Sequence, residues 1–257
     1  MSNKETIGKT FFVAGLLCVV CSAVVALSVI GLRDKQQANI VTDKRMNILA
    51  AAGVYKEGMD INSVYESKIE VKYIDLATGE YLSQVPAEGF DSVKAAKDKE
   101  FGELIPAKKD IAGIKRKSKY SDVYLFKDGG KTTKFILPVR GKGLWSTMIG
   151  FAAVDTDGQT ISGLTFYAHA ETPGLGGEID NPTWKAMWPG KKIYGSDGKV
   201  ILNVIKGTVV PGSSIEPYSV DGLAGATLTS RGVSNLIQYW FGPEGYKKFL
   251  TRVAGGQ

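Results

Sequence analysis

Residues 11–32 carry no charged side chain, and this long run limits what the chain can fold into more than any other feature. A helix of that length crosses a bilayer core of about 30 Å, because each residue adds about 1.5 Å. A signal peptide would have a shorter apolar core and a small-residue cleavage site, whereas this run leads directly into Arg33, Asp34 and Lys35. The sequence therefore predicts an N-terminal segment over 1–10, an uncleaved transmembrane helix over 11–32 and a folded domain over 33–257.

Positive charges flank both ends of the predicted span. Lys4 and Lys9 precede it and Arg33 and Lys35 follow it, so the basic residues give little preference for either orientation. Only ten residues precede the span and more than two hundred follow it. The simplest topology therefore keeps the N-terminus in the cytoplasm and exports the domain.

Cysteine occurs only as Cys18 and Cys21, both inside the predicted span. This excludes a disulfide framework, a cysteine-ligated iron–sulfur cluster and a thiolate zinc site in the domain. On one helix the two thiols would lie roughly on one face, where they could help to bind a metal shared with another subunit. The alternative is that they are small apolar residues of a membrane helix.

Short alternating segments separated by turn residues indicate a mainly antiparallel sheet, and the 31 glycines favour many tight turns. The expected strands are residues 68–75, 122–126, 133–139, 147–154, 160–167 and 200–205. The expected helices are residues 34–52, 181–187, 230–241 and 243–253, with Pro243 in the first turn of the last. Residues 82–119 lack clear periodicity and are expected to form loops with short helices. The predicted class is α+β, a transmembrane helix followed by an antiparallel sheet with flanking helices.

Three hydroxyl residues lie at the expected start of the helix over 230–241. Thr227, Thr229 and Ser230 follow the small residues Gly225 and Ala226, which allow a bulky group to approach the backbone. A helix N-terminus offers unpaired N–H groups and the positive end of its dipole, so a phosphate would be well placed there. The alternative is that Thr229 or Ser230 only caps the helix.

A glycine-rich loop follows the strand expected over 160–167. It contains Glu171, Thr172, Gly174, Leu175 and Gly176, and could place backbone N–H groups and a leucine against a planar ring. Its glycines do not form a dinucleotide-binding fingerprint. Taken alone, the loop is more typical of an ordinary turn than of a cofactor site.

Two kinds of side chain near this loop invite a functional interpretation. His169, the only histidine, lies two residues before Glu171, a spacing that suggests acid–base chemistry or simply a polar residue at a strand end. Trp145 and Trp184 could stack near a cofactor or belong to the core.

Residues 221–229, with the sequence DGLAGATLT, resemble the flavinylation motif of a family of membrane-anchored flavin carriers. In that motif a flavin transferase uses FAD to attach FMN to the last threonine of the glycine-alanine-threonine core, which is Thr227 here. Ala224 departs from the serine or threonine usual before the glycine. Residues 31–36, 143–146, 171–177 and 181–184 also resemble segments of this family.

The family comprises the C subunit of the sodium-translocating NADH:quinone oxidoreductase and the related G subunit of the Rnf electron-transport complex. Length and motif order favour the first, and the Rnf-type subunit is the alternative. The resemblance implies one FMN bound to Thr227 by a phosphoester. It also implies a cofactor site formed by Gly225, Ala226, Leu228, Thr229, Glu171, Thr172, Gly174, Leu175, Gly176 and Trp145, with no metal.

The function implied is electron relay within a membrane translocase, with no catalytic residue of its own. The partners implied are the other subunits of the complex, the flavin transferase and the bacterial inner membrane, with the domain in the periplasm. The charge of +6 is scattered, so nucleic acid is not an expected partner. A hypothesis of another class is a membrane-anchored structural subunit without a cofactor, in which Thr227 is only a loop residue.

Overall fold

The computed structural model describes residues 6–256 in two units, residues 6–43 and residues 44–256. The first unit is helical and belongs to α1 (Ile7–Ala51), and its side chains are exposed apart from that of Thr42. By length and composition this helix can cross a membrane. The predicted span and the residues 34–51 that follow it are both parts of α1.

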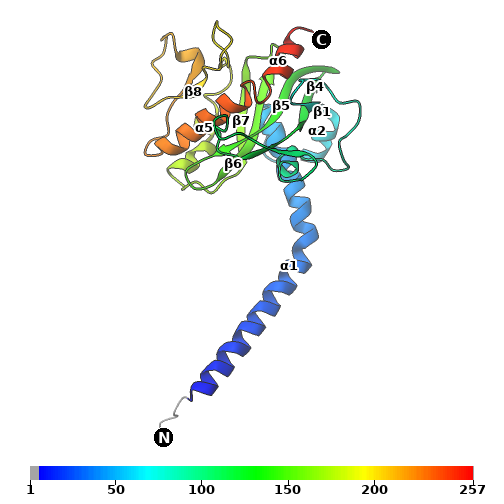
Figure 1. The fold of residues 1–257 in the computed structure, drawn as a ribbon, viewed down its shortest axis with the longest axis vertical. Coiled ribbons are helices and arrows are strands. Elements are labelled where there is room, and N and C mark those ends of the chain that lie inside the picture. The colour runs from blue at the N-terminus through cyan, green and yellow to red at the C-terminus, as the bar shows by residue number, and fades with distance from the viewer. Residues whose placement is uncertain (1–5, 257) are drawn as a thin grey trace. The chain divides into compact units, whose positions relative to one another are not determined.

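An antiparallel sheet forms the centre of the second unit (Figure 1). Its strands, in spatial order, are β1 (Ile69–Asp75), β4 (Tyr120–Asp128), β5 (Lys131–Lys142), β6 (Thr147–Asp155) and β7 (Ile161–Ala168). Every neighbouring pair is antiparallel. The two predicted hairpins are confirmed, and β5 and β6 form a third, closed by residues 143–146. The predicted α+β class is confirmed.

Both faces of the sheet are buried. Because successive side chains of a strand point to opposite faces, Val123 and Leu125 of β4 join one core cluster and Tyr124 and Phe126 join the other. Ile136 of β5 joins the same cluster as Tyr124. Burial on both faces explains why residues 123–126 of β4 and 135–139 of β5 are apolar without interruption.

Helices cover the two faces. α5 (Thr227–Trp240) and α6 (Lys247–Ala254) pack on the first face, where Val233, Leu236 and Ile237 are completely buried. Burial of each such side chain contributes about 1.5–3 kcal/mol. The last residues of α1, including Ile48, pack on the second face beside α2 (Ile61–Lys68).

Several predicted boundaries are wrong. The last helix begins at Lys247 rather than at residue 243, because the chain turns tightly after α5 and the N–H of Tyr246 donates to the carbonyl of Trp240 at 2.6 Å. Pro243 therefore lies in this turn and not in a helix. Residues 82–119 contain a small sheet as well as a short helix, and residues 61–68 form a helix that was not predicted.

The remaining elements are short. They are α3 (Ser92–Ala95), β2 (Gly102–Leu104), β3 (Arg116–Ser118), the 3-10 helix η1 (Gly176–Asp180), α4 (Pro182–Lys185), β8 (Asn203–Val204), the 3-10 helix η2 (Glu216–Tyr218) and β9 (Ser219–Val220). β8 pairs with β9 in parallel. The predicted strand over 200–205 and helix over 181–187 are thus present but shorter.

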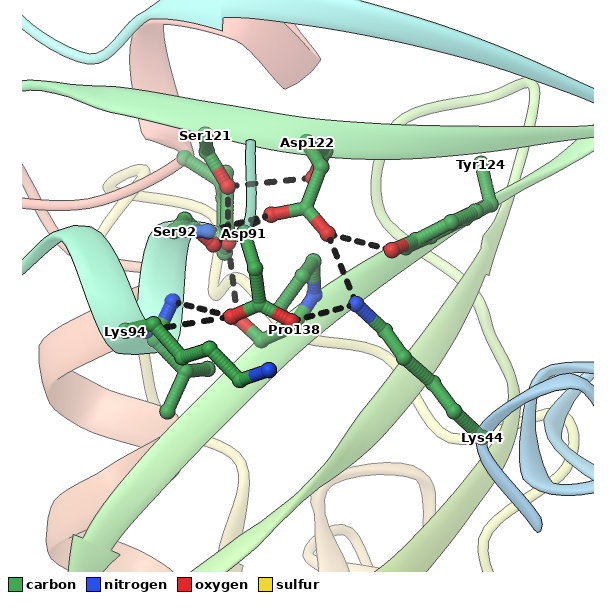
Figure 2. A network of polar contacts seen from close by, with 10 residues as sticks. Lys44, Asp91, Ser92, Lys94, Ser121, Asp122, Tyr124 and Pro138 are labelled. Atoms are coloured by element: carbon green, nitrogen blue, oxygen red, sulfur yellow. Dashed lines mark hydrogen bonds and ion pairs between the residues drawn. The ribbon is translucent and has the colours of Figure 1, made fainter. Parts of the chain in front are cut away.

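A buried ionic network connects α1 with β4 and the start of α3 (Figure 2). The ammonium of Lys44 lies 2.6 Å from Asp91 Oδ2 and 3.5 Å from Asp122 Oδ2. Asp122 also accepts hydrogen bonds from the backbone N–H of Ser92, at 3.1 Å, and from the hydroxyls of Ser92 and Tyr124. Asp122 is only 1% exposed, so Lys44 supplies most of the opposite charge that this carboxylate needs.

The charges of the network stabilise one another. Burial by itself lowers the pKa of Lys44, but Asp122 and Asp91 outweigh it and raise that pKa above 10.5. Burial likewise opposes ionisation of Asp91, yet the attraction of Lys44 keeps the pKa of Asp91 below 3.8. Lys44 and Asp91 are therefore both charged throughout the neutral pH range.

Replacement of Lys44 by methionine is expected to lower the free energy of unfolding by about 2–3 kcal/mol, because it leaves a buried carboxylate without its cation. The matched control is Lys68→Met, which removes an exposed ion pair with Asp128 and should cost less than about 1 kcal/mol. Urea unfolding of the detergent-solubilised full-length protein measures both. Equal losses in the two variants would contradict this role for Lys44.

Candidate functional site

Thr227 is the first residue of α5 and is exposed. The turn before it includes Gly225, whose φ of 71° reverses the chain, so the helix begins three residues earlier than predicted. The N-cap position is Ala226, and among the described residues no side chain caps this end. The alternative that Thr229 or Ser230 caps the helix is therefore wrong. Ser230 instead accepts a hydrogen bond from the N–H of Leu223 at 3.1 Å.

The carboxylate of Glu171 connects three segments of the chain. Its Oε1 accepts hydrogen bonds from the N–H groups of Trp145, at 3.0 Å, and Ser146, at 3.4 Å. Its Oε2 accepts from the N–H of Leu144, at 3.2 Å, and from the hydroxyl of Thr229 on α5, at 2.5 Å. Glu171 is 4% exposed, so these four donors replace the water that its charge would otherwise attract.

Hydrogen bonding keeps Glu171 ionised. Burial alone raises its pKa, but the donors from Thr229 and the backbone N–H groups outweigh this effect and bring the pKa below its ordinary value of 4.5. A fixed negative charge therefore lies beneath the loop of residues 143–146 at neutral pH.

Two glycines leave room for this carboxylate. A Cβ atom at Gly143 would collide with Glu171 Oε1. At Gly176 it would lie 2.6 Å from Thr229 Oγ1 and 2.8 Å from Glu171 Oε2. Both distances are too short for a carbon atom, so the contacts of Glu171 with Thr229 and the 143–146 loop require glycine at these positions.

A cavity of about 140 Å³ adjoins Glu171, and we call it the Trp145 cavity. It is lined by Leu144, Trp145, Glu171, Thr172, Leu175, Gly176, Gly225, Ala226 and Thr229. The side chains at its rim are apolar but exposed, with Trp145 68%, Leu175 44% and Leu144 42% accessible. Large exposed apolar side chains grouped in this way are typical of a site that a ligand or partner covers.

The cavity brings together most of the residues predicted from the sequence. Trp145, Glu171, Thr172, Leu175, Gly176, Gly225, Ala226 and Thr229 all line it. Gly174, Leu228 and Thr227 are exposed nearby but do not line it. Thr227 instead lines a neighbouring cavity, together with Lys206 and Arg231. Neither basic residue was predicted, although the four-residue spacing of Thr227 and Arg231 on a helix would have indicated a shared face.

His169 and Trp184 are the remaining candidates, and neither lines the Trp145 cavity. His169 Nε2 lies 2.6 Å from Asp180 Oδ2, and its Nδ1 accepts the N–H of Glu171 at 3.2 Å, so the histidine contacts the backbone of Glu171 and not its carboxylate. This geometry fits a polar residue at a strand end. Trp184 is 5% exposed, and its indole N–H donates to the carbonyl of Asp221 at 2.9 Å, so it belongs to the core.

A profile of the FMN-binding domain family matches residues 143–242. Every residue that lines the Trp145 cavity lies inside this range, so the fold and the site place the chain in a class of flavin-binding domains.

Curated relatives define the family more narrowly. The chain is 45% identical to the C subunit of the Na(+)-translocating NADH-quinone reductase of Pseudomonas aeruginosa, with all of both chains covered. It is 44% identical to that of Yersinia pestis, with 99% of this chain and 96% of the relative covered. The crystal structure of Shewanella oneidensis NqrC superposes with a TM-score of 0.75 at 34% identity, covering 82% of this chain and 98% of that one. The chain belongs to the family of Na(+)-translocating NADH-quinone reductase C subunits.

Replacement of Glu171 by glutamine is expected to lower the free energy of unfolding by about 1–3 kcal/mol, because a neutral amide accepts these hydrogen bonds less well. Amide hydrogen exchange at residues 144–146 should accelerate about tenfold or more. Glu178→Gln is the matched control, since within residues 6–256 the carboxylate of Glu178 accepts only from the side-chain amide of Asn181, at 2.7 Å, and Glu178 is partly exposed.

The loss of stability caused by Glu171→Gln depends on pH. The pKa of Glu171 is lower in the folded protein than its ordinary value of 4.5, so the stabilisation is complete above about pH 4.5 and disappears as the pH falls toward the folded pKa. The difference between wild type and Glu171→Gln should therefore shrink in acid. A difference that grows in acid would contradict the role assigned to the carboxylate.

Proposed function

We propose that this chain carries one FMN, bound to Thr227 by a phosphoester, and relays electrons within a Na(+)-translocating NADH-quinone reductase. The observation that carries the proposal is the position of Thr227. This residue begins α5, directly after Gly225 and Ala226 of the Trp145 cavity. The match to the FMN-binding domain family over the same residues supports it.

The residues around the Trp145 cavity suit a flavin. Trp145 and Leu175 offer exposed apolar surface to a planar ring. Gly225 beside Leu175 has a φ of 71°, a conformation that favours glycine, so no side chain at this position crowds Leu175. Bound FMN would supply reversible acceptance and donation of electrons. The ionised carboxylate of Glu171 disfavours further negative charge in the cavity and so lowers the tendency of a bound group to accept electrons.

In the attachment reaction, one bond to phosphorus forms and one bond to phosphorus breaks. One bond forms between Thr227 Oγ1 and the phosphorus of the FMN part of FAD, and the bond between that phosphorus and the oxygen of AMP breaks. AMP leaves, and the hydroxyl proton passes to a base of the flavin transferase. Thr227 is exposed at the start of a helix, so a transferase can reach it.

The proposed partners are the other subunits of the reductase, because the relatives are named as its C subunits. The exposed rim of the Trp145 cavity lets a redox partner approach the site closely. The chain would be a carrier within a translocase and not a complete enzyme. Catalysis of NADH oxidation would belong to another subunit.

We propose that residues 11–32 of α1 cross the bacterial inner membrane, with the N-terminus in the cytoplasm and the domain over 33–257 in the periplasm. Both cysteines lie in the apolar run of α1, so a single cysteine introduced in the domain can be labelled without interference. Lys131→Cys, beside the turn between β4 and β5, should react with a membrane-impermeant maleimide in intact spheroplasts. Labelling only after lysis would contradict this orientation.

Replacement of Thr227 by valine is expected to abolish covalent flavin, because the volume is kept and the hydroxyl is lost. The full-length chain is produced with a flavin transferase, denatured, and analysed by intact mass and by fluorescence under ultraviolet light. Wild type should gain the mass of one FMN less one water, and Thr227→Val should gain none.

Two control variants test whether the hydroxyl of Thr227 is the attachment point. Thr227→Ser keeps a hydroxyl and should accept some flavin, and Thr156→Val removes an exposed threonine in the β6–β7 turn and should be fully flavinylated. A wild-type protein without flavin would favour the cofactor-free structural subunit. Flavin retained by Thr227→Val would assign the attachment to another residue.

A further inference from the structure

A second cavity, which we call the Arg231 cavity, lies on the other side of the first turn of α5. Its volume is about 190 Å³. It is lined by Val204, Ile205, Lys206, Gly207, Gly222, Leu223, Thr227, Ser230, Arg231 and Ser234. The acceptor threonine therefore lines this cavity, whereas its neighbours Ala226 and Thr229 line the Trp145 cavity.

Helical periodicity creates one wall of the Arg231 cavity. Thr227, Ser230, Arg231 and Ser234 are spaced by three and four residues along α5, so they share one face of the helix. Arg231 lies one turn beyond Thr227. Its long side chain is exposed and lines the same cavity as the threonine.

The opposite wall is attached to α5 by hydrogen bonds. The N–H of Val204 donates to Ser234 Oγ at 2.9 Å, and the N–H of Leu223 donates to Ser230 Oγ at 3.1 Å. The N–H of Gly222 donates to the carbonyl of Gly207 at 2.8 Å. These bonds fix the segment that carries Lys206 beside the helix face that carries Arg231.

The cavity has an excess of positive charge. Neither Lys206 nor Arg231 takes part in an ion pair within residues 6–256, and none of the described residues that line the cavity is acidic. Two unpaired cations beside one hydroxyl generate a local potential that attracts an anion. The Trp145 cavity has the opposite character, since its charged residue is Glu171.

We propose that the Arg231 cavity is the phosphate subsite of this protein, where Lys206 and Arg231 bind the phosphate that becomes attached to Thr227. The inference rests on the proposed function. In the transfer, a P–O bond to Thr227 Oγ1 forms, the P–O bond to AMP breaks, and AMP departs with its own phosphate. The diester that remains on the protein has one negative charge, which the two cations outweigh. The apolar ring would then lie toward the Trp145 cavity.

The two residues have different parts in this subsite. The guanidinium of Arg231 can donate two parallel hydrogen bonds to phosphate oxygens, whereas the ammonium of Lys206 acts as a point charge. Both are positioning residues for the phosphate and not for the electron transfer itself.

The test uses the full-length protein with purified flavin transferase and FAD as the flavin donor. Lys206→Gln and Arg231→Gln remove the charge but keep a polar side chain, and Lys131→Gln removes a charge beside the β4–β5 turn as the matched control. The initial rate of covalent flavin incorporation should fall about fivefold in either cavity variant and more than tenfold in the double variant, as expected for exposed charge pairs of about 1 kcal/mol. Arg231→Lys should recover part of the rate.

A second readout separates phosphate binding from recognition by the transferase. In protein flavinylated to completion, the ³¹P resonance of the diester should shift in Lys206→Gln and Arg231→Gln but not in Lys131→Gln. Slower transfer with an unmoved ³¹P resonance would overturn the inference, because the cations would then act on the transferase. An unchanged rate in the double variant would also overturn it. Wild type without covalent flavin would overturn the proposed function and this inference with it.

Discussion

The carboxylate of Glu171 is the interaction on which the candidate site depends. Its four hydrogen-bond donors come from residues 144–146 and from Thr229, which are far apart in sequence. They bring together the β5–β6 turn, the loop after β7 and the first turn of α5. Because the charge is buried, loss of any donor leaves an anion that water cannot easily solvate. The same contacts explain why Gly143 and Gly176 cannot have side chains.

The sheet provides the rigid support for this site. Both of its faces are covered, so the strand ends that carry the β5–β6 turn and the loop after β7 are fixed by the core. Lys44, Asp91 and Asp122 add an ionic connection to α1 within the same unit. The functional residues thus lie on loops, where exposure permits contact with partners, while packed elements fix their positions.

The sequence predicts those parts of the fold that depend on local patterns. The hairpins were predictable because short apolar segments flank turns such as residues 128–130, and the flavinylation motif was recognisable from its residues. The start of α5 at Thr227 was not, because it depends on a single positive φ at Gly225. The donors of Glu171 and the approach of Lys206 to Arg231 were not predictable either, because they join segments distant in sequence.

The central claim is that one FMN is attached at the first residue of α5. Its most direct test is peptide mapping of the flavinylated wild-type protein. Trypsin cleaves after Lys206 and Arg231 and releases one peptide, residues 207–231, that contains the motif. Fragmentation by electron transfer, which preserves the phosphoester, should place the added mass of FMN less one water on Thr227. The same mass on any other residue, such as Thr229 or Ser230, would contradict the account.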